Sequence, residues 1–277
     1  MRGALSSEWQ LVMARRLPLL FSAIWSAMLA GFSMGIPFVV YMSLRSDPTQ
    51  DVDGLRSIVL LENAPATALG SYPMFGAAIM LVIGVLVAGP EFRWGTWTAR
   101  FSQGPSRAEV VMAKASVAII TTGIVVAVAL IAAIVVSAAL TLSLGSTTTF
   151  PGLGSLVTCF GASWAISAAW AIVGLGTSIV FRGTMAPVAV GLVWILAVEN
   201  IVAGLATMLT WFAPVRWLTL GAASGSLAAA AGADASTPGV AGVLNPVMAA
   251  LLIIVYCIVF CGVAVILMKR RDITDNR

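Results

Sequence analysis

The chain has 277 residues, of which 60% are hydrophobic and 9% are charged, whereas ordinary soluble domains carry about a quarter charged residues. This composition excludes an ordinary soluble domain and indicates an integral membrane protein. Several uncharged runs exceed the ~20 residues that a helix needs to cross a bilayer, and they lack the alternation of a barrel strand. We therefore expect one all-α transmembrane domain over residues 1–277.

A short interfacial helix is predicted before the first span, over about residues 7–16. Ser7 and Gln10 have the spacing of a capping box, which predicts the start of a helix. One side of this helix gathers the apolar residues Trp9, Val12 and Met13. The alternative interpretation is a plain cytoplasmic extension of the first span.

Six transmembrane helices are predicted from the uncharged runs. They cover about residues 17–44, 64–90, 115–144, 155–181, 184–211 and 244–268. The first is uncharged over 28 residues, too long for the apolar part of a signal peptide, so we expect an uncleaved span. The charge-free run 115–181 is divided into two spans by the turn-rich segment Gly145–Gly154.

The fifth predicted span is too long for one straight helix, because it carries Glu199 and Asn200 and then continues apolar to Phe212. We expect the helix to break between Glu199 and Gly204, and a short re-entrant segment to follow in the outer leaflet. Residues 222–242 are rich in Ala, Gly and Ser and predict a loop or a weak helix. The outer interface is marked by Trp211, Pro214, Arg216 and Trp217.

The net charge of +4 is distributed unevenly. An even number of spans leaves both termini on one side of the membrane. If that side is the cytoplasm, it holds twelve of the fifteen basic residues, and only Arg45, Arg56 and Arg216 remain outside. The positive-inside rule therefore predicts cytoplasmic termini.

Residues Glu91–Lys114 form a polar, basic and aromatic stretch between the second and third spans. Gly104 and Pro105 break one short helix from the next, and Ser106 with Glu109 has capping-box spacing. We expect a helix, a corner and a second helix in water at the cytoplasmic face.

The sequence lacks the residues of several kinds of catalytic site. No phosphate-binding loop of the G-x-x-x-x-G-K-[ST] type is present, and the absence of histidine excludes a Ser-His-Asp triad and a His-based zinc site. The three cysteines lie in apolar runs, where a structural role is expected. We expect no catalysis and no cofactor bound by this chain.

Three sequence features together resemble the six-helix permeases of the ABC-2 exporter family. They are the start E-W-Q-L-x-x-x-R-R at residues 8–16, the loop E-x-R-x-G-T at 91–96 with G-P-S-R at 104–107 and Lys114, and the basic tail K-R-R-D at 269–272. The resemblance implies two permease subunits, identical or paralogous, above two copies of a separate cytoplasmic ABC ATPase that binds ATP and Mg²⁺. It also implies a bacterial cell membrane and export of an amphiphilic molecule, a peptide or a lipid. A nucleic-acid partner is not expected.

In that family the loop after the second span supplies a coupling helix that docks in the ATPase, and spans one, two and five line the route. By position, the docking residues implied here are Glu91, Arg93, Gly95, Thr96, Arg100 and Arg107. The alternative is that these charges anchor the loop to lipid headgroups.

Glu199 and Asn200 are the candidate residues of a translocation path. A carboxylate inside a span is costly and indicates a function, so Glu199 either faces a cavity and attracts a cationic substrate, or satisfies backbone groups freed at the helix break. A secondary transporter should show repeated halves and several intramembrane charges, and neither is evident. A scaffold subunit of a membrane complex and an intramembrane enzyme stay open as alternatives.

Overall fold

The computed structural model describes residues 2–46, 52–97 and 106–270, and within these ranges the chain is almost wholly helical and has no strand. Six helical segments are long and apolar enough to cross a membrane. They run over Leu17–Leu44, Leu61–Arg93, Arg107–Ser143, Leu153–Phe181, Met185–Met208 and Pro246–Arg270. The predicted class, an all-α membrane protein with six spans, is confirmed.

Several spans are built from more than one helix. The helices are α1 (Arg2–Ala14), α2 (Leu17–Met28), α3 (Ile36–Leu44), α4 (Asp53–Val59), α5 (Ala64–Gly70), α6 (Ala77–Ala88), α7 (Pro90–Arg93), α9 (Arg107–Ser143), α10 (Leu153–Phe181), α11 (Met185–Val193), α12 (Glu199–Met208), α13 (Ala213–Trp217), α14 (Leu220–Ala230) and α15 (Pro246–Arg270). Within the described ranges, π-helical segments interrupt the first, second and fifth spans at Leu29–Gly35, Tyr72–Gly76 and Trp194–Val198. Short π-helical segments inside α-helices are rare and are frequently found at functional sites.

The N-terminal helix is longer than predicted. α1 begins by Arg2 rather than at Ser7, whose hydroxyl donates to the carbonyl of Ala4 instead of starting a helix. The chain passes from α1 into the first span through Arg16, which has a left-handed backbone (φ 53°). α1 lies against α9 and α2, so it belongs to the bundle.

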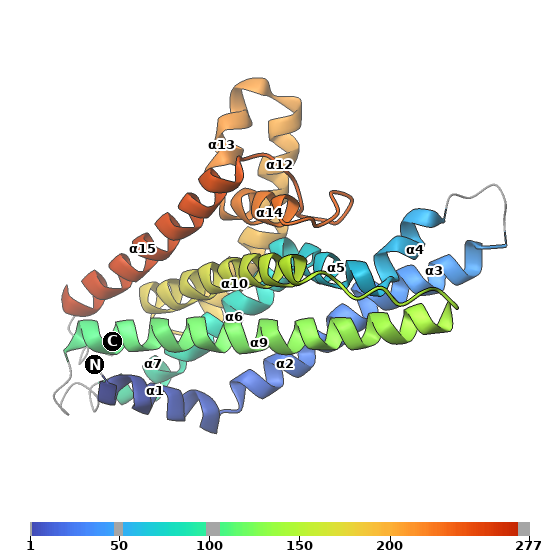
Figure 1. Ribbon diagram of the computed structural model, residues 1–277. Helices are drawn as coiled ribbons and strands as arrows, with labels where there is room; N and C mark the ends of the chain where they lie inside the picture. The colour runs from blue at the N-terminus through green and yellow to red at the C-terminus, as the bar shows by residue number, and fades with distance from the viewer. Residues whose placement is uncertain (1, 47–51, 98–105, 271–277) are drawn as a thin grey trace.

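α10 lies at the centre of the bundle and has its most extensive contact with α6, followed by α15 and α9 (Figure 1). The described ends of the chain, in α1 and α15, lie at the same end of the molecule, beside α7 and the start of α9 (Figure 1). The two described ends of the chain thus lie close together, and their place on the cytoplasmic side of a membrane stays a prediction.

Glycines allow α6 and α10 to approach each other closely. A Cβ placed on Gly84 of α6 would collide with the carbonyl of Ala171, and one placed on Gly174 of α10 would collide with the carbonyl of Leu81. The two backbones are thus in direct contact, as small residues permit between membrane helices.

The third span begins earlier than predicted. The capping box at Ser106 is confirmed: its hydroxyl accepts from the backbone N–H of Glu109 at 3.2 Å, and its own N–H donates to the Glu109 carboxylate at 3.0 Å. α9 then continues without a break from Arg107 to Ser143. Lys114 lies inside this helix, as expected, but it has no exposed surface, so its predicted place in water is wrong.

The predicted break in the fifth span is also misplaced. The helix continues through Glu199 and Gly204 to Met208 and breaks at Leu209, which is extended (φ −122°, ψ 102°). The chain then reverses through α13 and returns as α14, so the region predicted as a loop or weak helix from residue 222 is helical to Ala230. The corner between α12 and α13 projects from the side of the bundle (Figure 1).

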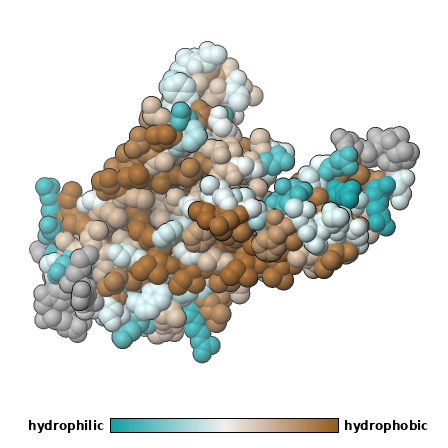
Figure 2. Space-filling view, in the orientation of Figure 1, coloured by the Kyte–Doolittle hydropathy of each residue, from teal (hydrophilic) through white to brown (hydrophobic). Residues whose placement is uncertain are grey.

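The visible surface has the pattern of a membrane protein. Figure 2 shows hydrophobic residues over the middle of the molecule, including the length of α15, and hydrophilic residues gathered toward the ends. Most of the fifth and sixth spans is exposed in the single chain. An apolar surface of this extent is expected to face lipid tails or another membrane subunit.

Candidate functional site

A buried ion cluster joins three helices at the end of the bundle that contains α1 and α7. The Lys114 ammonium donates to Glu8 at 2.7 Å, to Glu91 at 2.5 Å and to the carbonyl of Val87 at 3.2 Å. An ammonium has three N–H donors, and all three are used. Lys114 has no exposed surface, and the side chains of both glutamates are 2% exposed. We call Lys114, Glu8 and Glu91 the Lys114 cluster.

Each member of the cluster comes from a different element. Glu8 lies on α1, Glu91 on α7 at the end of the second span, and Lys114 on α9 at the start of the third. The ring of Trp97 lies 5.1 Å from the Lys114 nitrogen, within cation–π range. Arg15 adds a further bond from the α1–α2 joint to the carbonyl of Leu86 at 3.1 Å. The interfacial helix and both flanks of the polar stretch are therefore fixed to one another.

The structure describes five of the six predicted docking residues and divides them into three groups. Arg93, Gly95 and Thr96 are exposed, and Gly95 adopts a left-handed backbone (φ 63°) that favours glycine. Glu91 is buried, so its predicted place on the docking surface is corrected: it holds α7 against α9. Arg107 donates to the carbonyl of Met268, at the end of α15, at 2.9 Å.

Arg100 and the predicted break at Gly104–Pro105 lie outside the described residues. Next to Arg93, Trp94 is 72% exposed, and sequence reasoning had not singled it out. Docking on this segment stays a prediction.

The role of Glu8 and the burial of Lys114 were also not predicted from the sequence. A signal for the burial was available, because Ser106 fixes the helical phase and the residues one turn away from Lys114, Val110, Val111 and Ala118, are apolar. Nothing local indicated that Glu8, 106 positions earlier, is its partner.

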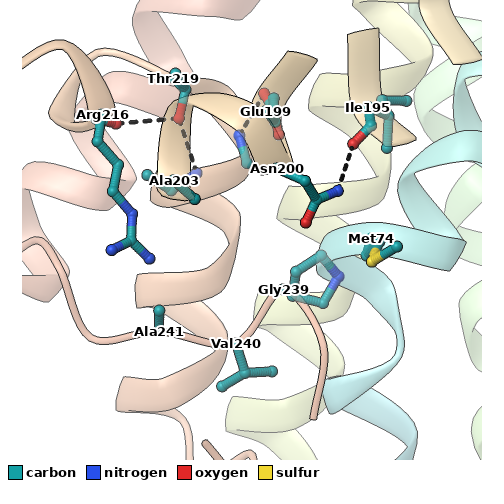
Figure 3. Close-up of a pocket in the computed structure, with 13 residues that line it drawn as sticks. Met74, Ile195, Glu199, Asn200, Ala203, Arg216, Thr219, Gly239, Val240 and Ala241 are labelled. Atoms are coloured by element: carbon teal, nitrogen blue, oxygen red, sulfur yellow. Dashed lines mark hydrogen bonds between the residues drawn. The ribbon is translucent and has the colours of Figure 1, made fainter. Parts of the chain in front are cut away.

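The second candidate site is a cavity of about 150 Å³ that is lined by other residues than the Lys114 cluster. It lies between α12, α13, the start of α14, the π-helical segment of the second span and residues 239–241 (Figure 3). Its polar lining includes Glu199, Asn200, Arg216 and Thr219. We call it the Glu199 cavity.

Glu199 lines the cavity and also satisfies a backbone N–H group, while attraction of a cationic substrate by Glu199 stays a prediction. One carboxylate oxygen accepts from the backbone N–H of Gly221 at 2.9 Å and from the indole N–H of Trp194 at 3.3 Å. Gly221 lies in the first turn of α14, where the helix dipole favours a negative charge. The carboxylate thus satisfies a backbone group and also lines the cavity, although the group belongs to α14 and not to a break in its own helix.

Asn200 stabilises the π-helical segment before it. Its amide N–H₂ donates to the carbonyl of Leu196 at 3.1 Å and to that of Ile195 at 3.4 Å. With the amide nitrogen directed to these carbonyls, its oxygen is the atom left to face the cavity. Figure 3 shows Asn200 and Arg216 both reaching toward the segment Gly239–Ala241.

The cavity has a fixed floor. The buried Ser226 hydroxyl donates to the carbonyl of Ala241 at 3.0 Å and accepts from the N–H groups of Val243 and Leu244. These bonds tie the segment that follows α14 back onto α14 itself. The floor of the cavity is therefore held in place by hydrogen bonds within the chain.

Neither site has the donor set of a metal centre. Among the residues that the structure describes, no three Cys, His, Asp or Glu side chains lie together as metal ligands. Cys257 and Cys261 are half-buried on α15, and Cys159 is buried on α10.

No family model matches the chain, and no curated protein matches it either. The assignment of the two candidate sites therefore rests on their geometry alone.

Gly221→Ala is expected to displace Glu199. A Cβ at Gly221 would occupy the place of the Glu199 carboxylate, so either the hydrogen bond at 2.9 Å is lost or α14 moves. We expect about 1–3 kcal/mol of destabilisation, measured as a lower unfolding midpoint of the purified protein. Gly204→Ala is the matched control, because a Cβ there meets nothing within 4 Å; equal effects of the two changes would contradict the assignment.

Proposed function

We propose that this chain is the permease subunit of an ATP-driven exporter of the ABC-2 type in a bacterial cell membrane. A second permease, identical or paralogous, would complete the membrane part, and two copies of a cytoplasmic ATPase would bind below. The substrate would be an amphiphilic small molecule, a peptide or a lipid. The observation that carries the proposal is the Lys114 cluster, together with the exposed segment beside it.

The cluster suits the transmission of movement. The stretch between α7 and α9 is flanked on one side by Glu91 and on the other by Lys114, which are hydrogen-bonded to each other. A partner that displaces this stretch would move the ends of the second and third spans together, with α1 attached, since a packed and bonded unit moves as a rigid body. Flexible flanks would absorb the same displacement.

The charge distribution supports a cytoplasmic position for this end. Basic residues gather there, namely Arg15, Arg16, Arg93, Arg107, Arg182, Lys269 and Arg270, whereas Arg45 and Arg56 lie near the opposite end, at α3 and α4. An excess of Lys and Arg marks the cytoplasmic side of bacterial membrane proteins. An ATPase would therefore meet the segment Arg93–Thr96.

Retention of an ATPase tests the proposal. The tagged chain is purified from the membranes of its own host, and the copurified proteins are identified by mass spectrometry and assayed for ATP hydrolysis. We expect a protein with a phosphate-binding loop in about one-to-one ratio with the chain. Its absence under conditions that keep other membrane complexes intact would favour the scaffold alternative.

Arg93→Glu combined with Trp94→Ala is expected to reduce ATPase retention about tenfold or more, because exposed Arg and Trp side chains commonly dominate interface energies. Both residues are exposed, so the fold should be little affected. Arg45→Glu, an exposed charge near the opposite end, is the control and should keep the ATPase bound. If the double variant binds as well as the control, this segment is not the docking surface.

A further inference from the structure

The Glu199 cavity contains both an acid and a base that are not paired with each other. Glu199 and Arg216 line the same space, yet among the described residues the Arg216 guanidinium forms no ion pair or hydrogen bond. Arg216 is half-buried, and its side chain points into the cavity (Figure 3). A guanidinium is a planar donor that matches phosphate and carboxylate groups.

The opposite wall offers acceptors. The Glu199 carboxylate has an oxygen with no hydrogen bond among the described residues, and the Asn200 amide oxygen is directed away from the two carbonyls that bind its nitrogen. These two neighbours on α12 are suited to accept N–H bonds from an ammonium group. The two walls therefore present opposite charges across one small space.

This pairing of charges restricts the ligand. A purely cationic ligand would leave Arg216 without a counterion, whereas a purely anionic ligand would face the Glu199 carboxylate. Either arrangement costs free energy where water is partly excluded. A ligand that carries both an ammonium and an acidic group satisfies both walls. The cationic substrate suggested by Glu199 alone is thus replaced by a zwitterion.

We propose that the Glu199 cavity is a binding site for a zwitterionic group that combines an ammonium with a phosphate or carboxylate, the ammonium on Glu199 and Asn200 and the anion on Arg216. The volume of about 150 Å³ lies below the ~300 Å³ from which drug-sized ligands are usually accommodated. It suits a headgroup or a small free zwitterion. Binding does not require ATP-driven export, so this proposal and the proposed function fail separately.

The surroundings are compatible with an attached lipid. Met208 and Trp211, in the projecting corner that connects α12 to α13, are 81% and 74% exposed. Acyl chains joined to a headgroup in the cavity could lie along such apolar side chains, whereas a free zwitterion would use the cavity alone. Both sources share one headgroup chemistry, and binding experiments separate them.

The test uses the purified full chain in detergent and native mass spectrometry of retained lipid. The probes are phosphatidylethanolamine, phosphatidylglycerol and a trimethylammonium lipid with the same acyl chains, and soluble phosphoethanolamine measured by calorimetry. We expect phosphatidylethanolamine to be retained about tenfold more than the two singly charged lipids, which corresponds to one charge-assisted contact. Binding of phosphoethanolamine without retention of the lipid would assign the site to a free zwitterion.

Two substitutions and a control decide the assignment. Arg216→Gln and Glu199→Gln should each abolish the preference for the zwitterion, whereas Arg45→Gln, an exposed arginine near the far end of the first span, should leave it unchanged. Arg216→Gln is the safer variant, because the guanidinium makes no hydrogen bond within the described part of the chain, so its loss should not unfold the protein. Equal retention of all three lipids without phosphoethanolamine binding, or an unchanged preference in Arg216→Gln, would overturn the proposal.

Discussion

Lys114→Met is expected to destabilise the protein by about 3–5 kcal/mol, which is typical for the loss of one partner from a buried ion pair. The substitution removes the ammonium that bonds Glu8, Glu91 and the Val87 carbonyl, while both carboxylates stay in an environment of low dielectric. Methionine fills a similar volume, so the effect reports charge and not a cavity. The measurement is the unfolding midpoint of the purified protein. Unfolding is monitored as the loss of the monodisperse peak in size-exclusion chromatography after heating.

Lys269→Met is the matched control, since Lys114 and Lys269 are the two lysines of the chain and Lys269 is exposed. We expect it to change stability by less than about 0.5 kcal/mol. Adding Glu8→Gln and Glu91→Gln to Lys114→Met should recover part of the loss, because neutral amides cost less to bury than carboxylates. Equal midpoints for the two lysine variants would show that the cluster contributes no net stability.

If the chain is the permease of an ATP-driven exporter, as proposed, the Lys114 cluster should also affect transport. The neutral triple variant should retain the ATPase, because Arg93 and Trp94 are unchanged, but its transport per ATP hydrolysed should fall if the cluster transmits movement. Unchanged transport in a stable triple variant would limit the Lys114 cluster to a structural role.

Gly174→Val is expected to destabilise the protein by about 3 kcal/mol or more, near the upper end of the range for overpacked interiors. The Cβ alone would collide with the carbonyl of Leu81, and backbone atoms cannot change rotamer to avoid it. α6 and α10 must therefore separate, at the most extensive helix contact in the described fold. The measurement is again the unfolding midpoint, supplemented by the yield of folded protein in membranes.

Gly161→Val is the control for this effect. Gly161 lies on the same helix, and a Cβ there meets nothing within 4 Å. Both changes introduce the same β-branched residue into a helix, so differences in helix propensity cancel. If Gly161→Val is as destabilising as Gly174→Val, close packing of α6 and α10 is not the cause.

The sequence by itself determined the features that depend on local chemistry. The length of the apolar runs predicted all six spans, because the bilayer sets a minimum helix length. The capping box at Ser106 was predicted correctly, because cap and partner are three residues apart. Span ends and the break near Glu199 were less accurate, since apolar composition alone does not indicate where a helix in a membrane stops.

The tertiary structure decided which charged residues meet. Lys114 joins Glu8 across 106 positions, and Glu199 shares a cavity with Arg216 and meets Gly221 of α14 only because the chain reverses between α12 and α14. The burial of a residue depends on which other helices pack against it. Neither the composition nor the periodicity of the sequence indicates which helices these are. The physical reason is that ionic contacts and backbone crossings act between segments far apart in the chain, whereas spans and caps are encoded within a few turns.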